Sequence, residues 1–301
     1  MQFRSAEYAA ALALMLVAPS ASAQACCAGA AFVTPGRLGL HDFVLVGADL
    51  RAAAVVGSFD ASGHYTSRAP GTVEDDLEED VFAAIRVLKR GQIAFFVPII
   101  QTIRRAGALT DAGGGIGDVN LSARWDFFNA GQSRYLPGIA VLAGVTFPTG
   151  VPIESAGDPL GAGATGIGAF QFNGGLALEQ TFGPWLIGLS GIVAARTSRS
   201  VGTISETLAP QLSALATLAY VTRREIAIAV SSALTYEDDA SINDQTAPGT
   251  ERLTLTFSAG LLLPLADTWR AQVGANVVPP IVGVNTLASA GLQWTLVHTW
   301  F

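Results

Sequence analysis

The feature that most constrains this chain is a two-residue alternation of apolar and polar side chains. In the stretch GIGDVNLSARWDFF, residues 115–128, an apolar residue stands at every second position from Val119 to Phe127. Successive side chains of a β-strand point to opposite faces, so such a segment separates an apolar medium from an aqueous one. The rhythm recurs along the chain and predicts an all-β protein. It recurs in residues 44–56, 170–179, 225–236, 252–263 and 269–277.

Composition narrows the choice of apolar medium. Half of the 301 residues are hydrophobic and only 14% are charged, with a mean hydropathy of +0.43. Past the N-terminus, no run of about 18 apolar residues is available for a membrane helix. Two candidates remain, a large soluble β-sandwich or a closed β-barrel in a lipid bilayer. The net charge of -7 provides no basic excess, so no nucleic-acid partner is expected.

The N-terminus has the pattern of an export signal. Residues 1–23 contain Arg4, an apolar stretch over 9–17, and small residues at 21–23 where a signal peptidase would cleave. This predicts a signal peptide over 1–23.

The cysteines exclude a disulfide framework. Cys26 and Cys27 are the only two in the chain and lie just after the predicted cleavage site. One interpretation is a weak lipobox that would attach lipid to Cys26. The other is an unstructured periplasmic tail over 24–40, because chain termini are usually disordered unless they are tied down.

The connections between strands favour the barrel over the sandwich. Short connections such as FGPW and VTRRE alternate with long ones rich in Gly, Pro and acids, such as PTGVPIESAGDPLGAGATG. Short periplasmic turns and long extracellular loops are typical of a transmembrane antiparallel up-and-down β-barrel, here of about twelve strands. The predicted strands are 42–58, 78–89, 92–104, 117–128, 137–148, 167–182, 185–198, 207–221, 225–237, 251–265, 268–279 and 286–301.

Aromatic residues cluster near the predicted turns, as expected of residues at a membrane interface. The chain also ends in an aromatic residue, as outer-membrane barrels commonly do. These residues are Trp125, Phe127, Phe128, Phe182, Trp185, Trp269, Trp294, Trp300 and Phe301. The sequence therefore predicts a barrel in the bacterial outer membrane.

Two motifs resemble those of a known family of outer-membrane barrels. GIGDVNLSARW, residues 115–125, is similar to the Gly-x-Gly-Asp strand start of the meta-pathway of phenol degradation family of transporters, and LAGVTFPTG, residues 142–150, to its strand ending in Pro-Thr-Gly. The resemblance implies transport of small hydrophobic or aromatic molecules. We expect Pro148 to mark the end of its strand, because proline has no N–H to donate to a sheet. The residues that match the motifs are Gly115, Gly117, Asp118, Pro148, Thr149 and Gly150.

The alternation also predicts which charged side chains face the lumen. They are separated by small residues such as Gly188 and Ser190, and a barrel of more than about eight strands is not filled by its own wall. Charged rings could select solutes, or Arg and acid pairs could simply brace the wall. The predicted pore-lining residues are Asp49, Arg51, Arg86, Arg124, Asp126, Glu179, Arg196, Arg252 and Arg270.

Other motifs give weaker signals. GAGATG, residues 161–166, matches a dinucleotide-binding pattern but lacks the flanking strand and helix, so an external loop is expected. His41, His64 and His298 do not converge with a nucleophile and an acid in the predicted barrel, so no catalytic residue is assigned. The acidic run TVEDDLEED, residues 72–80, is placed in the first external loop, either binding divalent cations that bridge lipopolysaccharide or simply solvated. Neither a cofactor nor a protein-bound metal is predicted.

These features predict a barrel over 41–301 that passes small molecules passively, with the hydrophobic or aromatic class implied by the resemblance. The alternative is a structural or adhesive barrel that acts through its extracellular loops, followed by a barrel enzyme. The expected partners are small-molecule solutes, outer-membrane lipid and lipopolysaccharide, and the barrel-assembly machinery.

Overall fold

The computed structural model describes residues 37–201 and 204–301, and in them twelve long strands form the wall of one barrel. The predicted signal peptide and both cysteines lie outside the described residues. The strands are β1 (Val44–Phe59), β3 (Val73–Val87), β4 (Gly91–Ala106), β6 (Val119–Phe128), β7 (Gly138–Phe147), β8 (Gln171–Phe182), β9 (Trp185–Arg196), β12 (Gln211–Val221), β13 (Ala227–Glu237), β16 (Arg252–Pro264), β17 (Trp269–Val278) and β19 (Leu287–Trp300).

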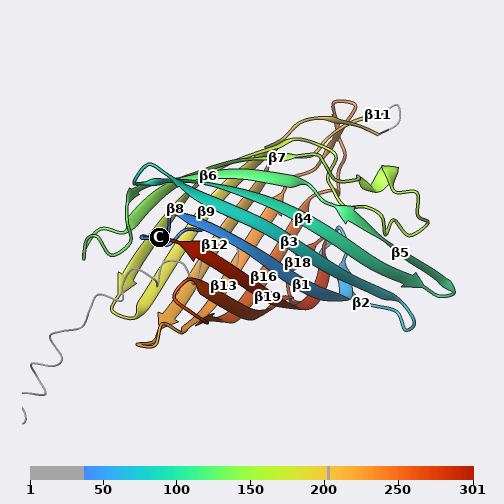
Figure 1. The fold of residues 1–301 in the computed structure, drawn as a ribbon. Coiled ribbons are helices and arrows are strands. Elements are labelled where there is room, and N and C mark those ends of the chain that lie inside the picture. The colour runs from blue at the N-terminus through green and yellow to red at the C-terminus, as the bar shows by residue number, and fades with distance from the viewer. Residues whose placement is uncertain (1–36, 202–203) are drawn as a thin grey trace, which may run out of the picture.

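The sheet is closed and antiparallel throughout. Each strand pairs with its sequence neighbours, and β1 pairs with β19 from Val44–Trp300 to Ser58–Leu287, which joins the two ends of the sheet. Figure 1 shows the resulting barrel, with strands strongly tilted to its long axis. The predicted all-β antiparallel barrel of twelve strands is confirmed. No helix within the described ranges is long and apolar enough to span a membrane.

The register separates an apolar outer face from a polar inner face. In β6, Leu121 and Trp125 point outward and are 39% exposed, whereas Asn120, Ser122 and Arg124 point inward and line a cavity. Large apolar side chains are exposed on the outside of every long strand. A soluble protein rarely exposes such a continuous apolar surface. The apolar face of the alternation in residues 119–127 therefore contacts lipid, and the polar face lines the lumen.

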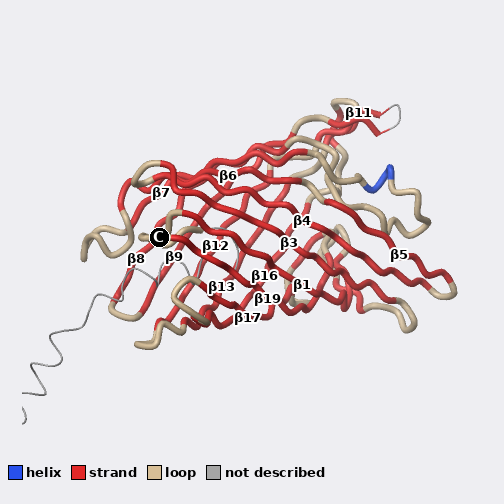
Figure 2. The backbone as a smooth tube through the Cα atoms, in the orientation of Figure 1, coloured by secondary structure: helices blue, strands red, loops and turns tan. Residues whose placement is uncertain are grey.

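The two ends of the barrel differ as the connections predict. The first residue of β1 and the last residue of β19 lie at the same end of the barrel. Most connections at this end are short, namely 88–90, 183–184, 222–226 and 265–268, although the β6–β7 connection, 129–137, is longer. The long loops gather at the opposite end, visible as tan segments at the right of Figure 2. Short turns mark the periplasmic end and long loops the extracellular end.

The extracellular segments contain additional short elements. β2 (Tyr65–Ser67) pairs with β1, and β18 (Gly283–Val284) pairs with β16. A 3-10 turn, η2 (Ile153–Ser155), lies in the β7–β8 loop. Two further loops together form a small sheet of four strands outside the barrel wall. These strands are β10 (Arg199–Val201), β11 (Ile204–Thr207), β14 (Ser241–Ile242) and β15 (Gln245–Thr246).

Two of the predicted loops are wrong, because both segments are strands. The acidic run lies in β3, where its carboxylates alternate between the two faces instead of occupying an external loop. Residues 105–116, which the predicted strands leave as a connection between 92–104 and 117–128, extend the wall, since β5 (Leu109–Ile116) pairs with β4 from Ile99 to Ala106. A strand rich in acids is tolerated because its inner face meets the aqueous lumen. The misplaced acids are Glu74, Asp75, Asp76, Glu78, Glu79 and Asp80.

Aromatic side chains surround the periplasmic end of the barrel on its outer face. Trp185 packs edge-to-face on Tyr220 at 4.9 Å between ring centroids, and His298 lies between Trp269 and Trp300 at 4.6 and 4.1 Å. These positions match the predicted interfacial belt. Trp294 is the exception, since it lies six residues inside the end of β19.

A charge placed on the outer face should destabilise the barrel according to its depth. Leu189, in the middle of β9, is 53% exposed on that face. We expect Leu189→Arg to lower the free energy of unfolding in lipid vesicles by about 2–4 kcal/mol, because arginine is then near the bilayer midplane. Leu265→Arg, at a periplasmic turn, should cost about 0–1 kcal/mol. Equal costs in denaturant titrations of the two variants would contradict a lipid-facing β9.

Candidate functional site in the barrel lumen

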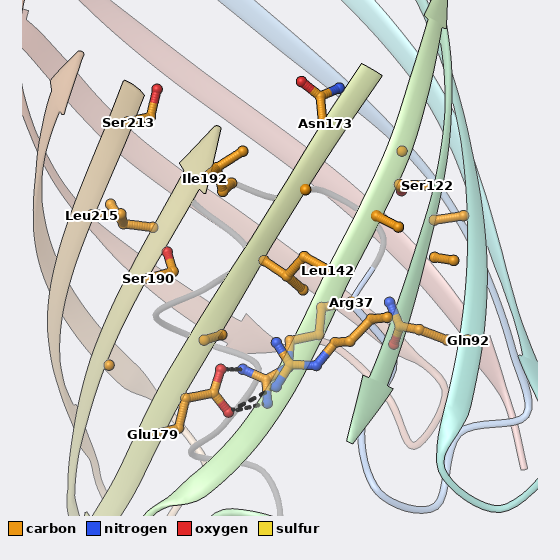
Figure 3. Close-up of a pocket in the computed structure, with 18 of the residues that line it drawn as sticks. Arg37, Gln92, Ser122, Leu142, Asn173, Glu179, Ser190, Ile192, Ser213 and Leu215 are labelled. Atoms are coloured by element: carbon orange, nitrogen blue, oxygen red, sulfur yellow. Dashed lines mark hydrogen bonds and ion pairs between the residues drawn. The ribbon is translucent and has the colours of Figure 1, made fainter. Parts of the chain in front are cut away.

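A cavity of about 360 Å³ opens in the lumen against the strands β4, β6, β7, β8, β9 and β12. Small inward residues, among them Gly144 and Gly188, create its space. A side chain added at Gly188 would come no closer than 3.8 Å to its neighbours at Cβ, which shows how open the wall is there. Figure 3 shows the lining side chains.

Three apolar side chains form a patch in the middle of the cavity, which we call the apolar waist. Leu142 of β7, Ile192 of β9 and Leu215 of β12 point into it (Figure 3). Asn173 lies towards the extracellular side of these residues, whereas Ser213 stands opposite Ile192 and Ser190 opposite Leu215 in the register. A molecule in this cavity therefore meets the hydrocarbon of three neighbouring strands together with a few hydrogen-bonding groups, as is common for small-molecule sites.

Ion pairs line the periplasmic end of the cavity. Both terminal nitrogens of Arg37 donate to the carboxylate of Glu179, which also accepts from Arg124 at 3.2 Å. Arg124 in turn pairs with Asp126 at 2.8 Å. The side chains of Arg37, Arg124 and Glu179 are about one-tenth exposed, so these charges are held largely out of water. Arg37 precedes β1 in the chain, yet it reaches the inner face of β8.

The segment 37–43 is tied to the inside of the barrel. Asp42, 1% exposed, accepts from the backbone N–H of Gly39 at 3.0 Å and pairs with Arg270 at 3.1 Å. Arg86 donates to the carbonyl of Asp42 at 2.9 Å and to that of Gly39. Leu38 is buried with Phe82 of β3. The segment thus narrows the periplasmic end of the lumen.

The register places all nine of the predicted lumen residues on the inner face of the barrel. Most of them are paired with one another or with further residues of the wall. Arg51 pairs with Glu78, and Arg196 with Glu237 at 2.7 Å. Arg252 is exposed at the extracellular end, near the carbonyl of Asn285. Such pairs can both brace the wall and set the electrostatics of the lumen.

A second cavity, of about 940 Å³, adjoins the opposite wall. It is lined by three consecutive residues from each of β1, β3, β4, β17 and β19, and by residues 112 and 113 of β5. The residues that flank the centre of each triplet point outward, so the cavity is a groove on the outer face of the wall. The inward-pointing central residues, Ala53, Asp76, Thr102, Asn276 and Gly291, lie on one row of the register.

The residues of the two family-like motifs meet at one point of the extracellular half. We call Asp118, Thr149 and Gly150 the clasp. Asp118 accepts from the backbone N–H groups of Gly150 at 2.9 Å and Ile167 at 2.6 Å, and Thr149 donates to the carbonyl of Gly117 at 2.7 Å. The clasp joins the break between β5 and β6 to the β7–β8 loop.

Close packing explains two of the glycines around the clasp, Gly117 and Gly150. A Cβ on Gly150 would lie 2.7 Å from the Cα of Gly166, and one on Gly117 would lie 2.8 Å from the ring of Pro98. β7 ends at Phe147, so Pro148 stands where the strand leaves the wall, as expected from its missing N–H. Gly115 lies in β5 opposite Ile100.

The β7–β8 loop covers the inner face of the β4–β5 hairpin. Arg104 donates to the carbonyls of Leu160 and Gly161 at 2.8 and 3.0 Å, and Asp111 accepts from the N–H of Leu160 at 3.1 Å. The segment GAGATG, predicted as an external loop, is part of this loop. The loop therefore narrows the lumen from the extracellular side.

Sequence reasoning missed Arg37 and the apolar waist. Arg37 lies in the predicted tail, where no alternation signals contact with the barrel. In GIAVLAGVTF, large and small apolar residues occupy both faces, so the inward position of Leu142 is not visible in the pattern. Of the histidines, His64 lies in an extracellular turn and His298 at the periplasmic end. No group of three His, Cys, Asp or Glu suited to a metal occurs within the described ranges.

Comparison with known proteins supports the fold. No protein-family model matches the sequence, and no curated protein matches it. The COG4313 outer membrane channel from Pseudomonas putida F1 is similar in structure, with a TM-score of 0.74 over 89% of this chain and 100% of that one, at 14% identity. The KdgM porin (TM-score 0.48, 7% identity, 85% and 99% covered) and a mutant TodX monoaromatic hydrocarbon channel (0.44, 9%, 86% and 90%) are more distant. The chain therefore has the fold of a bacterial outer-membrane β-barrel channel.

Removing the carboxylate of the clasp should release the β7–β8 loop. We expect Asp118→Ala to lower the free energy of local opening at Gly150 and Ile167 by about 2 kcal/mol, because two charge-assisted hydrogen bonds are lost. Amide hydrogen exchange of the refolded barrel measures this change. Asp267→Ala, at a periplasmic turn, is the control and should leave exchange in the loop unaltered. Unchanged protection in Asp118→Ala would show that the clasp does not hold the loop.

Proposed function

We propose that this protein is a passive outer-membrane channel for small hydrophobic or aromatic molecules. The observation that carries the proposal is the lumen cavity with its apolar waist, Leu142, Ile192 and Leu215, inside a closed barrel. A barrel of more than about eight strands encloses more space than its own side chains fill. The resemblance of the clasp motifs to the transporter family supports the same substrate class.

The proposed route runs through the lumen between two narrow points. A solute enters past the β7–β8 loop, meets the apolar waist, and leaves past the pair Arg37–Glu179 and the segment 37–43. The nine predicted pore-lining residues contribute to the electrostatic field of this route. An uncharged solute crosses without breaking any of these ion pairs, whereas a strongly charged solute competes with the paired side chains for their partners. In this proposal, residues 1–23 act as the export signal and 24–40 as a periplasmic tail whose last residues, from Arg37 onward, enter the periplasmic end of the barrel.

Two glycines of β9 offer a matched test of the route. Gly188 points into the cavity, whereas Gly191 points outward, where an added Cβ meets nothing within 4 Å. We expect Gly188→Trp to lower single-channel conductance in planar bilayers and to slow uptake of small aromatic solutes into liposomes, because the indole occupies the cavity. Gly191→Trp should leave both rates unchanged.

Equal rates in the two tryptophan variants would mean that solutes do not use this cavity. A folded, heat-modifiable barrel with neither conductance nor aromatic uptake would reject the channel. It would favour the structural or adhesive alternative, in which the extracellular loops act.

Removing the contacts that hold the segment 37–43 should widen the lumen at its periplasmic end. Asp42→Ala removes the acceptor for Gly39 and the partner of Arg270. We expect a larger and noisier single-channel conductance than in the wild-type protein. Lys89→Ala, at an exposed turn of the same end, is the control. Unaltered conductance in Asp42→Ala would show that the segment does not restrict the current.

A further inference from the structure

We propose that one side of the periplasmic rim of the barrel binds the phosphate groups of anionic phospholipids in the surrounding membrane leaflet. The surface consists of five basic side chains on three turns, which we call the basic arc. The inference goes beyond the proposed channel, because it concerns the outside of the barrel and not its lumen. The residues of the basic arc are Lys89, Arg90, Arg134, Arg223 and Arg224.

The turns of the basic arc follow one another along the rim, at the end of the barrel where β19 ends (Figure 1). Arg90 donates to the carbonyl of Phe127, at the end of β6, at 2.9 Å. The β8–β9 turn stands between the second and third of them, and the carbonyl of Pro184 in it accepts from the N–H of Val221 at 2.8 Å. The three turns are 88–90 (β3–β4), 129–137 (β6–β7) and 222–226 (β12–β13).

The β6–β7 connection lies on the lipid side of the wall. Gln180 of β8 stands opposite Ile187, which is exposed on the outer face, so Gln180 also points outward. The amide nitrogen of Gln180 donates to the carbonyls of Ser133 and Arg134 at 3.2 and 3.1 Å. The connection is thereby held against the outer face of β8, and Arg134 stands at the boundary with lipid.

The cations of the basic arc lack the carboxylate partners that most other arginines of the barrel have. In the lumen and at the extracellular end, Arg196 pairs with Glu237 and Arg199 with Glu206, each at 2.7 Å. All five side chains of the arc are exposed, and none of them forms an ion pair with a residue that the structure describes. Their three turns contain one acid, Glu225. The arc therefore presents positive charge that the protein itself leaves without a partner.

Apolar side chains beside these cations place them at the depth of lipid headgroups. Tyr135 and Leu136, next to Arg134, are 87% and 58% exposed, and Leu88, next to Lys89, is 72% exposed. Aromatic side chains occupy the interface between hydrocarbon and water, and long basic side chains extend from there to the polar layer. Each of these two turns thus combines an apolar tip with a cation, as a surface between hydrocarbon and phosphate requires.

Phospholipid phosphate is the anion that meets such a surface. A guanidinium group offers paired N–H donors that match the oxygens of a phosphate. Each Lys or Arg near an anionic membrane surface adds to the attraction. A lipid with net negative charge is preferred over a zwitterionic one, because the arc has five cations and one acid. The β16–β17 turn carries only the acid Asp267, so the preference is confined to one side of the rim.

Barrels with a single tryptophan test this preference. One retains Trp185, which stands opposite Tyr220 close to the β12–β13 turn, and the other retains Trp269, which follows the β16–β17 turn. Phenylalanine replaces the remaining tryptophans. Each barrel is refolded in vesicles of phosphatidylcholine and phosphatidylglycerol, with brominated chains on one lipid or the other. From the quenching of tryptophan fluorescence, we expect phosphatidylglycerol to be enriched about fivefold at Trp185 and not at Trp269.

Two variants of the Trp185 barrel assign the preference to the arc. Arg223→Gln/Arg224→Gln should remove the enrichment. Arg105→Gln, which removes an exposed cation at the extracellular end, is the control and should retain it. Raising the salt concentration to about 1 M should weaken the enrichment in the wild-type arc, because exposed charges are then screened. Heat-modifiable migration in gels establishes that each variant is folded.

Equal quenching by the two brominated lipids at Trp185, or an enrichment that persists in the double variant, would overturn the inference. Equal quenching combined with a thermal unfolding temperature that inorganic phosphate raises would overturn it as well, and would mean that the arc binds a soluble anion. Quenching requires no solute flux, so either result leaves the proposed channel to its own test.

Discussion

The whole structure depends on one constraint, the need to satisfy every backbone N–H and C=O group inside hydrocarbon. A sheet meets this need only when it closes, because any free edge would leave a row of unpaired groups in lipid. Here the pairing of β1 with β19 provides the closure. Closure also fixes the two environments of the chain, since each strand must present alternate residues to lipid and to the lumen. The large apolar surface on the outside follows directly from it.

The same constraint decides how the lumen is built. Because lipid takes the apolar side chains, most of the charges are left to the inner face, where they need partners. The ion pairs Arg196–Glu237 and Arg124–Asp126 provide such partners across or along strands. Arg37 comes from outside the wall to join Glu179, so the segment before β1 is held by the charges that the barrel turns inward. Space remains where glycine, alanine and serine replace larger residues.

Much of this architecture could be predicted. Three local properties of the chain predict the strand number, the closure of the barrel and its orientation. They are the period-two alternation, the length of the strands, and the alternation of short and long connections. Charge predicts a loop for the acidic run, whereas β3 accepts alternate carboxylates on a face that meets water. The glycines of the β4–β5 hairpin hide its two-residue alternation, so its sequence predicts a loop.

The sequence by itself determined which side chains share a face, since that depends only on the two-residue period of a strand. It therefore sufficed to place Asp49, Glu179 and Arg196 on the inner face. Only the tertiary structure decided which side chains meet, because strand pairing and the packing of loops and of the segment before β1 join residues far apart in the chain. The pairing of Asp118 with Gly150, of Arg37 with Glu179 and of Asp49 with Asp80 arises in this way. Cavities likewise depend on closure, because they are the space that twelve strands enclose together.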